Sequence, residues 1–90
     1  MELIKTLKID NDLGLHARAA AKIVALTEQY QSALFFSKDE REVDGSSILA
    51  ILTLACPKGS EVKARAVGDD SEDLMKALSD LFENKFGEER

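Results

Sequence analysis

The chain has 90 residues, of which 44% are hydrophobic and 32% are charged, and its formal net charge is −5. This length and composition predict one globular domain (residues 1–90) with a modest core. The acidic balance, with no basic stripe, argues against a partner with a nucleic-acid backbone.

The chain also lacks the marks of secretion and membrane insertion. No basic stretch followed by a long apolar run begins the sequence, so we expect no signal peptide. The longest apolar run, Ile48–Cys56, is interrupted by Thr53 and is far shorter than a membrane span. A single cysteine excludes an internal disulfide and predicts a cytoplasmic location.

The first half of the chain predicts three strands and one helix. Leu3–Ile9 alternates between apolar and polar residues and reads as a strand. Residues 17–29 carry apolar residues at helical spacing. Ala33–Phe36 and Arg41–Val43 are expected to form two antiparallel strands joined by a tight turn.

The second half predicts a short helix, a strand and a longer helix. Ser46 or Ser47 is placed to cap a short helix that runs to about Leu54. Val62–Ala66 alternates as the clearest strand of the chain. The final helix is capped by Asp70 or Ser71 and buries a stripe of Leu74, Leu78, Leu81 and Phe82.

The element order β-α-β-β-α-β-α predicts an α+β fold. A four-stranded antiparallel sheet with three helices packed on one face satisfies this order as an open-faced sandwich. Lys63 and Arg65 then lie on the uncovered face of the sheet.

The segment Gly14–Arg18 offers the most specific chemistry. It contains His16, the only histidine, where the first predicted helix begins. The first N–H groups of a helix lack intrahelical partners and bind anions, and Arg18 adds a positive charge. This positive field disfavours the imidazolium form, so we expect His16 to be neutral and nucleophilic. The segment thus predicts a nucleophile beside a phosphate cradle.

Three segments resemble the HPr family, the histidine phosphocarriers of the bacterial phosphoenolpyruvate-dependent phosphotransferase system. They are Gly14–Ala20, Val43–Ala50 and Leu54–Val62, and the resemblance covers essentially the whole chain. It implies the HPr-like open-faced sandwich. Leu81–Glu89 is similar to the nitrogen-related branch of the family, often called NPr.

The resemblance implies a role for the histidine segment. His16 would accept a phosphoryl group on Nδ1 from Enzyme I, which obtains it from phosphoenolpyruvate, and pass it to an EIIA-type acceptor domain. The Arg18 side chain and the backbone N–H groups of Ala17 and Arg18 would stabilise the phosphate. The protein would be a phosphorylated intermediate without cofactor, rather than a stand-alone turnover enzyme. The family usually has proline where this chain has Ala19, so we expect altered rigidity or phosphate contacts there.

The resemblance also implies a regulatory serine and a docking surface on a monomer. Ser47 matches the serine that an HPr kinase/phosphorylase modifies in some bacteria; the alternative is that it only caps the short helix. Ile51 is expected in the core. We call the expected binding surface for Enzyme I and the acceptors the docking patch; its residues are Ala17, Ala21, Ile48, Leu49 and Leu52. The alternative is that most of its apolar side chains are core residues.

Other classes of site find little support. The acidic clusters at Asp39–Glu40 and Asp69–Asp73 lack the spacing of a calcium loop. One histidine and one cysteine are too few for a structural zinc site.

The alternative function is a regulatory binding module of the same fold, which controls a partner without passing a phosphoryl group on.

Overall fold

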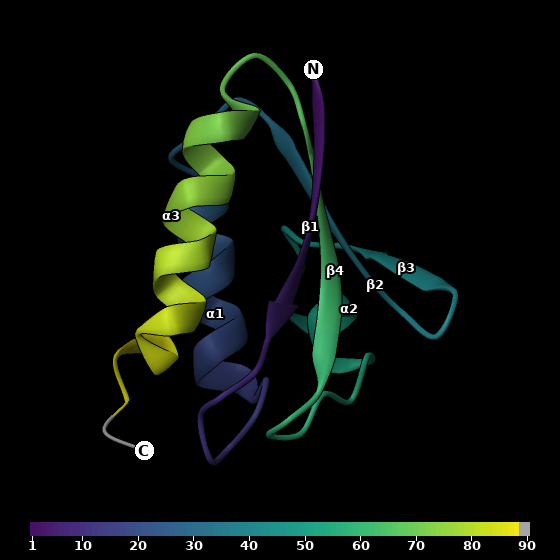
Figure 1. The fold of residues 1–90 in the computed structure, drawn as a ribbon, viewed down its shortest axis with the longest axis vertical. Coiled ribbons are helices and arrows are strands. Elements are labelled where there is room, and N and C mark those ends of the chain that lie inside the picture. Colours follow the sequence, from purple (N-terminus) through teal and green to yellow (C-terminus); the bar gives the residue numbers. More distant parts are fainter. Residues whose placement is uncertain (89–90) are drawn as a thin grey trace.

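The computed structural model describes residues 1–88 (Figure 1). In chain order the elements are β1 (Glu2–Lys8), α1 (Ala17–Thr27), β2 (Ala33–Lys38), β3 (Arg41–Asp44), α2 (Ile48–Leu52), β4 (Glu61–Val67), α3 (Ser71–Glu83) and the short 3-10 turn η1 (Lys85–Gly87). The strands form one antiparallel sheet in the order β1-β4-β2-β3. The predicted α+β class and element order are confirmed.

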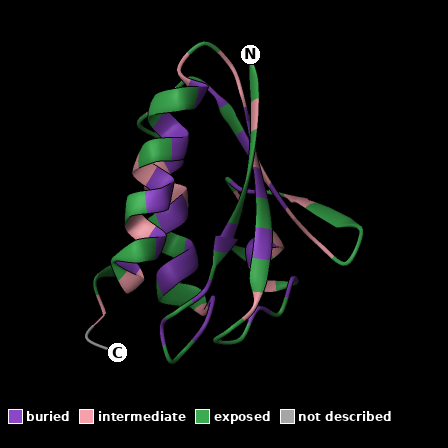
Figure 2. Cartoon of the chain, viewed as in Figure 1, coloured by how far each residue is buried: buried purple, intermediate pink, exposed green. Residues whose placement is uncertain are grey.

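Strand β4 pairs with both β1 and β2 and therefore supplies the centre of the covered sheet face. Its inward residues Val62, Ala64 and Ala66 are all buried. The two alanines are small, so the helices can approach the middle of the sheet closely. Figure 2 shows the resulting alternation of buried and exposed residues along this strand.

The opposite face of the sheet carries polar and charged side chains, as predicted. Arg65 forms ion pairs with Glu2 on the neighbouring strand β1 at 3.1 Å and with Glu42 on β3, two strands away, at 2.8 Å. Its guanidinium carbon also lies 4.4 Å from the centre of the Phe35 ring. Arg65 thus covers the apolar ring of Phe35 on the face of the sheet opposite the helices.

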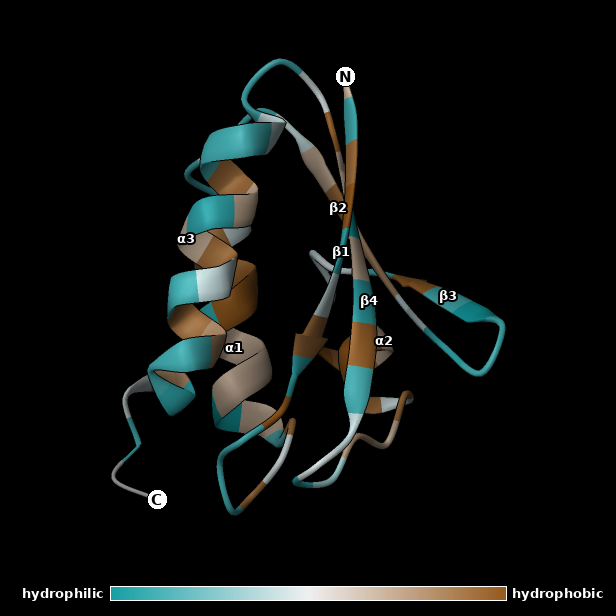
Figure 3. Cartoon of the chain, viewed as in Figure 1, coloured by the Kyte–Doolittle hydropathy of each residue, from teal (hydrophilic) through white to brown (hydrophobic). Residues whose placement is uncertain are grey.

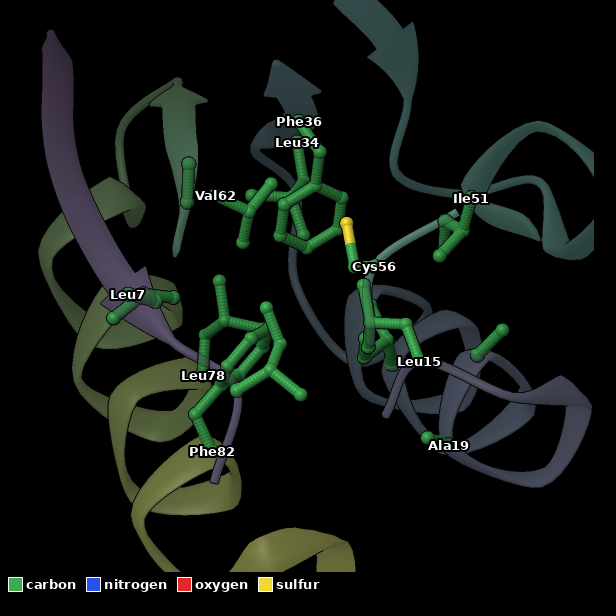
Figure 4. Packing of buried hydrophobic residues seen from close by; sticks show 14 of the residues in the cluster. Leu7, Leu15, Ala19, Leu34, Phe36, Ile51, Cys56, Val62, Leu78 and Phe82 are labelled. Carbon is green, nitrogen blue, oxygen red and sulfur yellow. The ribbon is translucent and has the colours of Figure 1, made fainter. Parts of the chain in front are cut away.

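Helices α1 and α3 lie side by side against the other face (Figure 1). Hydrophobic residues alternate with hydrophilic ones along both helices (Figure 3), and Ile23 on α1 and Leu74 and Leu78 on α3 belong to the shared core. Among the largest fully buried side chains are Ile9, Ile23, Leu34, Phe36, Ile51, Val62, Leu74 and Leu78. Figure 4 shows part of this core, in which residues from both long helices, α2 and three strands meet.

Details of helices α1 and α3 differ from the sequence prediction. Helix α1 ends at Thr27 rather than at residue 29, because Gln29 and Tyr30 donate to carbonyls only three residues back, which tightens the last turn. On α3, Leu81 is only half-buried, whereas Phe82 is fully part of the core. None of the helices in residues 1–88 is long and apolar enough to cross a membrane.

Asp70 stands at the N-cap position of α3, but its carboxylate makes no capping hydrogen bond. Instead it accepts hydrogen bonds from the backbone N–H groups of Gln31 and Ser32, both at 2.8 Å, and from the Ser32 hydroxyl. The hydrogen bonds from the Ser32 hydroxyl and the Gln31 N–H lower the pKa of Asp70 below its ordinary value. This side chain thus ties the start of α3 to the start of β2.

We predict that Asp70→Asn destabilises the protein relative to the wild type. This loss of stability should be larger at neutral pH than in acid. A carboxyl whose folded pKa is depressed stabilises the fold above its unfolded pKa of about 3.9 and loses that contribution as the pH falls through the folded value. The difference in free energy of unfolding between wild type and variant should therefore be largest near pH 7 and shrink below about pH 4. Urea unfolding at several pH values measures it. Asp69→Asn is the matched control; an equal effect from this variant would contradict the role of Asp70.

Candidate functional site

The loop between β1 and α1 is held by backbone hydrogen bonds to the loop that precedes β4. Ile9 N–H donates to the Ser60 carbonyl at 2.9 Å, and Gly59 N–H donates to the Ile9 carbonyl at 2.8 Å. Further along, Leu15 N–H donates to the Cys56 carbonyl at 2.9 Å. Two segments far apart in the sequence therefore set the path of the chain into α1.

Gly14 makes the closest approach between these two loops. Its φ is +68°, in the left-handed region, and a Cβ atom on it would lie 2.4 Å from the Cys56 carbonyl oxygen and 2.9 Å from Pro57 Cα. Because both neighbours are backbone atoms, no side-chain rearrangement can make room. The fully buried Asn11 closes the turn, donating from Nδ2 to the Gly14 carbonyl at 2.8 Å.

His16 is the N-cap residue of α1. Its backbone is extended, with φ −87° and ψ 178°, and its carbonyl accepts the first helical hydrogen bond from Ala20 N–H at 2.9 Å. The side chain does not cap the helix, and no acidic residue lies in the first turn. Within residues 1–88, neither the cap residue nor the first turn therefore supplies a side-chain acceptor to the positive end of α1, beside an imidazole that is 25% exposed.

The residues predicted to hold phosphate lie on this first turn. Ala17 and Arg18 are both exposed, and within residues 1–88 the Arg18 guanidinium makes no hydrogen bond or ion pair. An unpaired arginine of this kind keeps its five N–H donors available for an anion. Ala19, the third residue of α1, is fully buried.

Glu88 is the functional neighbour that the sequence reasoning missed. One of its carboxylate oxygens contacts His16 Nε2, and the other accepts a hydrogen bond from Asn11 Nδ2 at 2.9 Å. Burial opposes ionisation of this carboxyl, but the hydrogen bonds to His16 and Asn11 outweigh it, so the pKa of Glu88 lies below its ordinary value.

The environment of His16 therefore includes a carboxylate that the sequence did not predict, in addition to the helix N-terminus. His16 stands at the N-terminus of α1, with Arg18 two positions later, and the Glu88 carboxylate contacts its ring at Nε2. His16 and Glu88 are 72 residues apart in the sequence. No local pattern predicts their contact, because it depends on how the chain turns after α3.

The predicted docking patch is exposed where the sequence placed it. Leu49 is 76% exposed and Ile48 is 37% exposed, whereas Ile51 is fully buried, as predicted. Leu52 is half-buried; Ala17 and Ala21 are exposed on α1, which packs against α2. The alternative that most of these apolar side chains belong to the core is therefore wrong for Ile48 and Leu49.

Leu13 is a further exposed apolar residue that was not predicted. It is 67% exposed and stands three positions before His16 in the same loop. An apolar residue between Asp12 and Gly14, in a segment with turn character, is the signal that points to it.

The two neighbouring serines have different roles in the structure. Ser47 is the N-cap of α2, and its Oγ accepts from Ala50 N–H at 3.2 Å. The Ser46 hydroxyl instead donates to Asp44 Oδ1 at 2.7 Å. Of the two predicted capping candidates, Ser47 is the one confirmed.

No group of three or more histidine, cysteine, aspartate or glutamate side chains within residues 1–88 is arranged to hold a metal ion. Cys56 is buried, and burial raises the pKa of its thiol. A thiol that is buried and protonated is a poor nucleophile, so Cys56 serves packing in the core.

Residues 3–84 match the family described as the PTS HPr component phosphorylation site, where PTS is the phosphotransferase system. The chain belongs to the HPr family. It is 43% identical over 83 residues to the phosphocarrier protein HPr of Xylella fastidiosa, covering 92% of this chain and 93% of the relative. It is 37% identical over 86 residues to the HPr of Neisseria meningitidis, covering 96% and 97% of the two chains.

Solved structures agree with this assignment. The crystal structure of HPr-C-His from Thermoanaerobacter tengcongensis superimposes with a TM-score of 0.93 at 43% identity, covering 98% of this chain and 99% of that one. An HPr from Bacillus anthracis gives a TM-score of 0.85 at 30% identity, covering 90% and 96%. The protein is thus an HPr phosphocarrier of the phosphotransferase system. These relatives carry the name HPr and give no specific support to the nitrogen-related branch.

We predict that Gly14→Ala is more destabilising than Gly59→Ala. Both glycines have positive φ, so each substitution costs about 1 kcal/mol in backbone strain. Only at Gly14 does the added methyl meet backbone, which adds roughly 1–3 kcal/mol and displaces the loop that carries His16. Urea unfolding measures the cost, and the NMR shift of the His16 ring reports the displacement. Equal costs for the two variants, with an unmoved His16 resonance, would contradict the close packing of the loops.

Proposed function

We propose that His16 is the phosphoryl acceptor of this HPr-family protein. It receives the group from Enzyme I, which obtains it from phosphoenolpyruvate, and passes it to an EIIA-type acceptor domain. The observation that carries the proposal is the position of the imidazole at the N-terminus of α1, an 11-residue helix whose first turn has no side-chain cap and no acidic residue.

The chemistry needs a nucleophile and a modest anion site. The imidazole supplies the lone pair, while the backbone N–H groups of Ala17 and Arg18 and the Arg18 guanidinium bind the phosphate oxygens. A helix N-terminus contributes up to about 2 kcal/mol to the binding of an anion. A carrier must release its cargo, so a partly exposed site of this strength suits the task better than an enclosed one. In-line phosphoryl transfer asks little more of the protein than positioning and charge.

The docking patch provides the surface on which Enzyme I and the acceptor bind in turn. Exposed Leu49 and Ile48 on α2, together with Leu52 and with Ala17 and Ala21 on α1, form an apolar area close to the proposed site. A small patch of this kind supports weak binding and fast release, which a carrier that serves more than one partner requires.

Two further roles complete the proposal. Ser47 is a candidate for modification by an HPr kinase/phosphorylase, because its hydroxyl lies at the start of α2 next to the docking patch. A phosphate there would add about −1.5 to −2 charge and weaken binding of an acidic partner. We also propose that residues 1–90 act as one cytoplasmic, monomeric phosphocarrier domain, which the shared core of the described elements supports.

We predict that His16→Ala abolishes phosphorylation. Wild-type protein incubated with phosphoenolpyruvate and Enzyme I should gain one acid-labile phosphoryl group, seen by intact mass and by phosphorus NMR. His16→Ala should gain none, and Ser46→Ala, which removes an exposed hydroxyl near the docking patch, should behave as wild type. If the wild type binds Enzyme I but takes no phosphoryl group, the alternative of a regulatory binding module is correct.

We predict that Leu49→Asp lowers phosphoryl transfer without unfolding the protein. A charge in the centre of an apolar docking patch should cost at least about 1.4 kcal/mol of binding, a loss of roughly tenfold or more in kcat/KM for transfer from Enzyme I. Ile4→Asp is the matched control, since Ile4 is an exposed apolar residue on the uncovered face of the sheet. Thermal unfolding shows whether each variant is folded. Equal transfer rates for the two variants would show that α2 is not part of the docking surface.

A further inference from the structure

The chain after α3 turns back toward the phosphorylation-site loop. Lys85, Phe86 and Gly87 all have left-handed φ, between 54° and 77°, which reverses the chain direction within the short turn η1. Figure 1 shows this end of the chain at the same end of the molecule as the loop between β1 and α1.

Two contacts anchor this turn. The Phe86 ring is 1% exposed and packs edge-on against Phe82, with ring centroids 4.8 Å apart. The Lys22 ammonium on α1 donates a hydrogen bond to the Phe86 carbonyl. Left-handed φ at two non-glycine residues is costly, so this conformation persists because the surrounding packing enforces it.

The anchored turn places the Glu88 side chain against the proposed site. Its carboxylate contacts His16 Nε2 with one oxygen and accepts from the Asn11 amide with the other. Asn11 Nδ2 also donates to the Gly14 carbonyl, so Glu88 is connected to both ends of the turn that carries His16. Within residues 1–88, the other ring nitrogen, Nδ1, has no hydrogen-bond partner.

We propose that Glu88 is a positioning residue that occupies Nε2 of His16 and thereby directs phosphoryl transfer to Nδ1. A carboxylate accepts hydrogen bonds, so its partner nitrogen carries the proton, and in a neutral imidazole the lone pair then belongs to the other nitrogen. This inference rests on the proposed role of His16 as the acceptor and adds the reason why one of its two nitrogens reacts.

Phosphoryl transfer to Nδ1 requires no movement of the ring proton. The Nδ1 lone pair forms a bond to phosphorus, the bond from phosphorus to the donor breaks, and its electron pair leaves with the donor. The proton stays on Nε2, so the phosphorylated ring carries a positive charge that the Glu88 carboxylate compensates. When the phosphoryl group leaves, the Nδ1–phosphorus pair returns to the ring and restores the neutral imidazole.

The test uses phosphoramidate, a small chemical donor that transfers its phosphoryl group and releases ammonia, so that no Enzyme I is required. The full chain is treated as wild type, as Glu88→Ala and as Glu83→Ala. Glu83 is the matched control because it is an exposed carboxylate at the end of α3, near the same turn. Phosphorus NMR distinguishes a phosphoryl group on Nδ1 from one on Nε2, and thermal unfolding confirms that each variant is folded.

We expect wild type and Glu83→Ala to be modified only on Nδ1. Glu88→Ala should lose this exclusivity and acquire a resolved fraction on Nε2, because that nitrogen is uncovered. The same ratio of isomers in all three proteins would overturn the proposal, as would modification of the wild type on Nε2 or no modification of any protein. Since the donor is a small molecule, a failure of the Enzyme I assay would count against the proposed function and leave this test intact.

Discussion

The packing of α1 and α3 against one face of the sheet is the constraint on which the rest of this structure depends. Small residues at the centre, Ala64 and Ala66, let the helices approach, and buried Phe36 and Leu78 fill the space between the layers. With the helices on one face, every connection between layers must lie at an end of the sandwich (Figure 1). The loop that carries His16 is one of these connections.

The proposed site is assembled where segments distant in sequence meet at one end of the sandwich. Gly14 lies against the backbone at Cys56, Leu15 shares a hydrogen bond with that same residue, and Glu88 reaches back after α3. The backbone of His16 is therefore held by these loop contacts, and its ring is contacted by Glu88. A rigid frame around a partly exposed ring suits a residue that must meet a donor and an acceptor in turn.

The electrostatics of the site are mixed rather than uniformly positive. The N-terminus of α1 and Arg18, which makes no ion pair within residues 1–88, favour an anion, while the ionised Glu88 contacts the imidazole at Nε2. Opposed fields of this kind limit how strongly a phosphoryl group is held. For a carrier, whose cargo must move on, moderate stabilisation serves better than tight binding.

The sequence by itself determined the local features of this protein. Alternation in β1 and β4, helical spacing in α1 and α3, and the capping hydroxyl of Ser47 are encoded within a few residues, so the element order and the position of His16 at a helix start were predictable. The motifs around Gly14 and Ser47 also carried the family resemblance, which implied that Leu49 on α2 is exposed; Ile51 was expected in the core, where it lies.

Only the tertiary structure decided which distant residues meet. The contact of Glu88 with His16 depends on three successive left-handed φ values after α3 and on burial of Phe86, none of which a local pattern reveals. Asp70 or Ser71 was predicted to cap α3; Asp70 stands at the N-cap position, yet its carboxylate binds the backbone at Gln31 and Ser32, because the fold brings that segment within reach. Local periodicity reports which face of an element is buried, whereas the partner of a charged side chain is chosen by the packing of elements far apart in the chain.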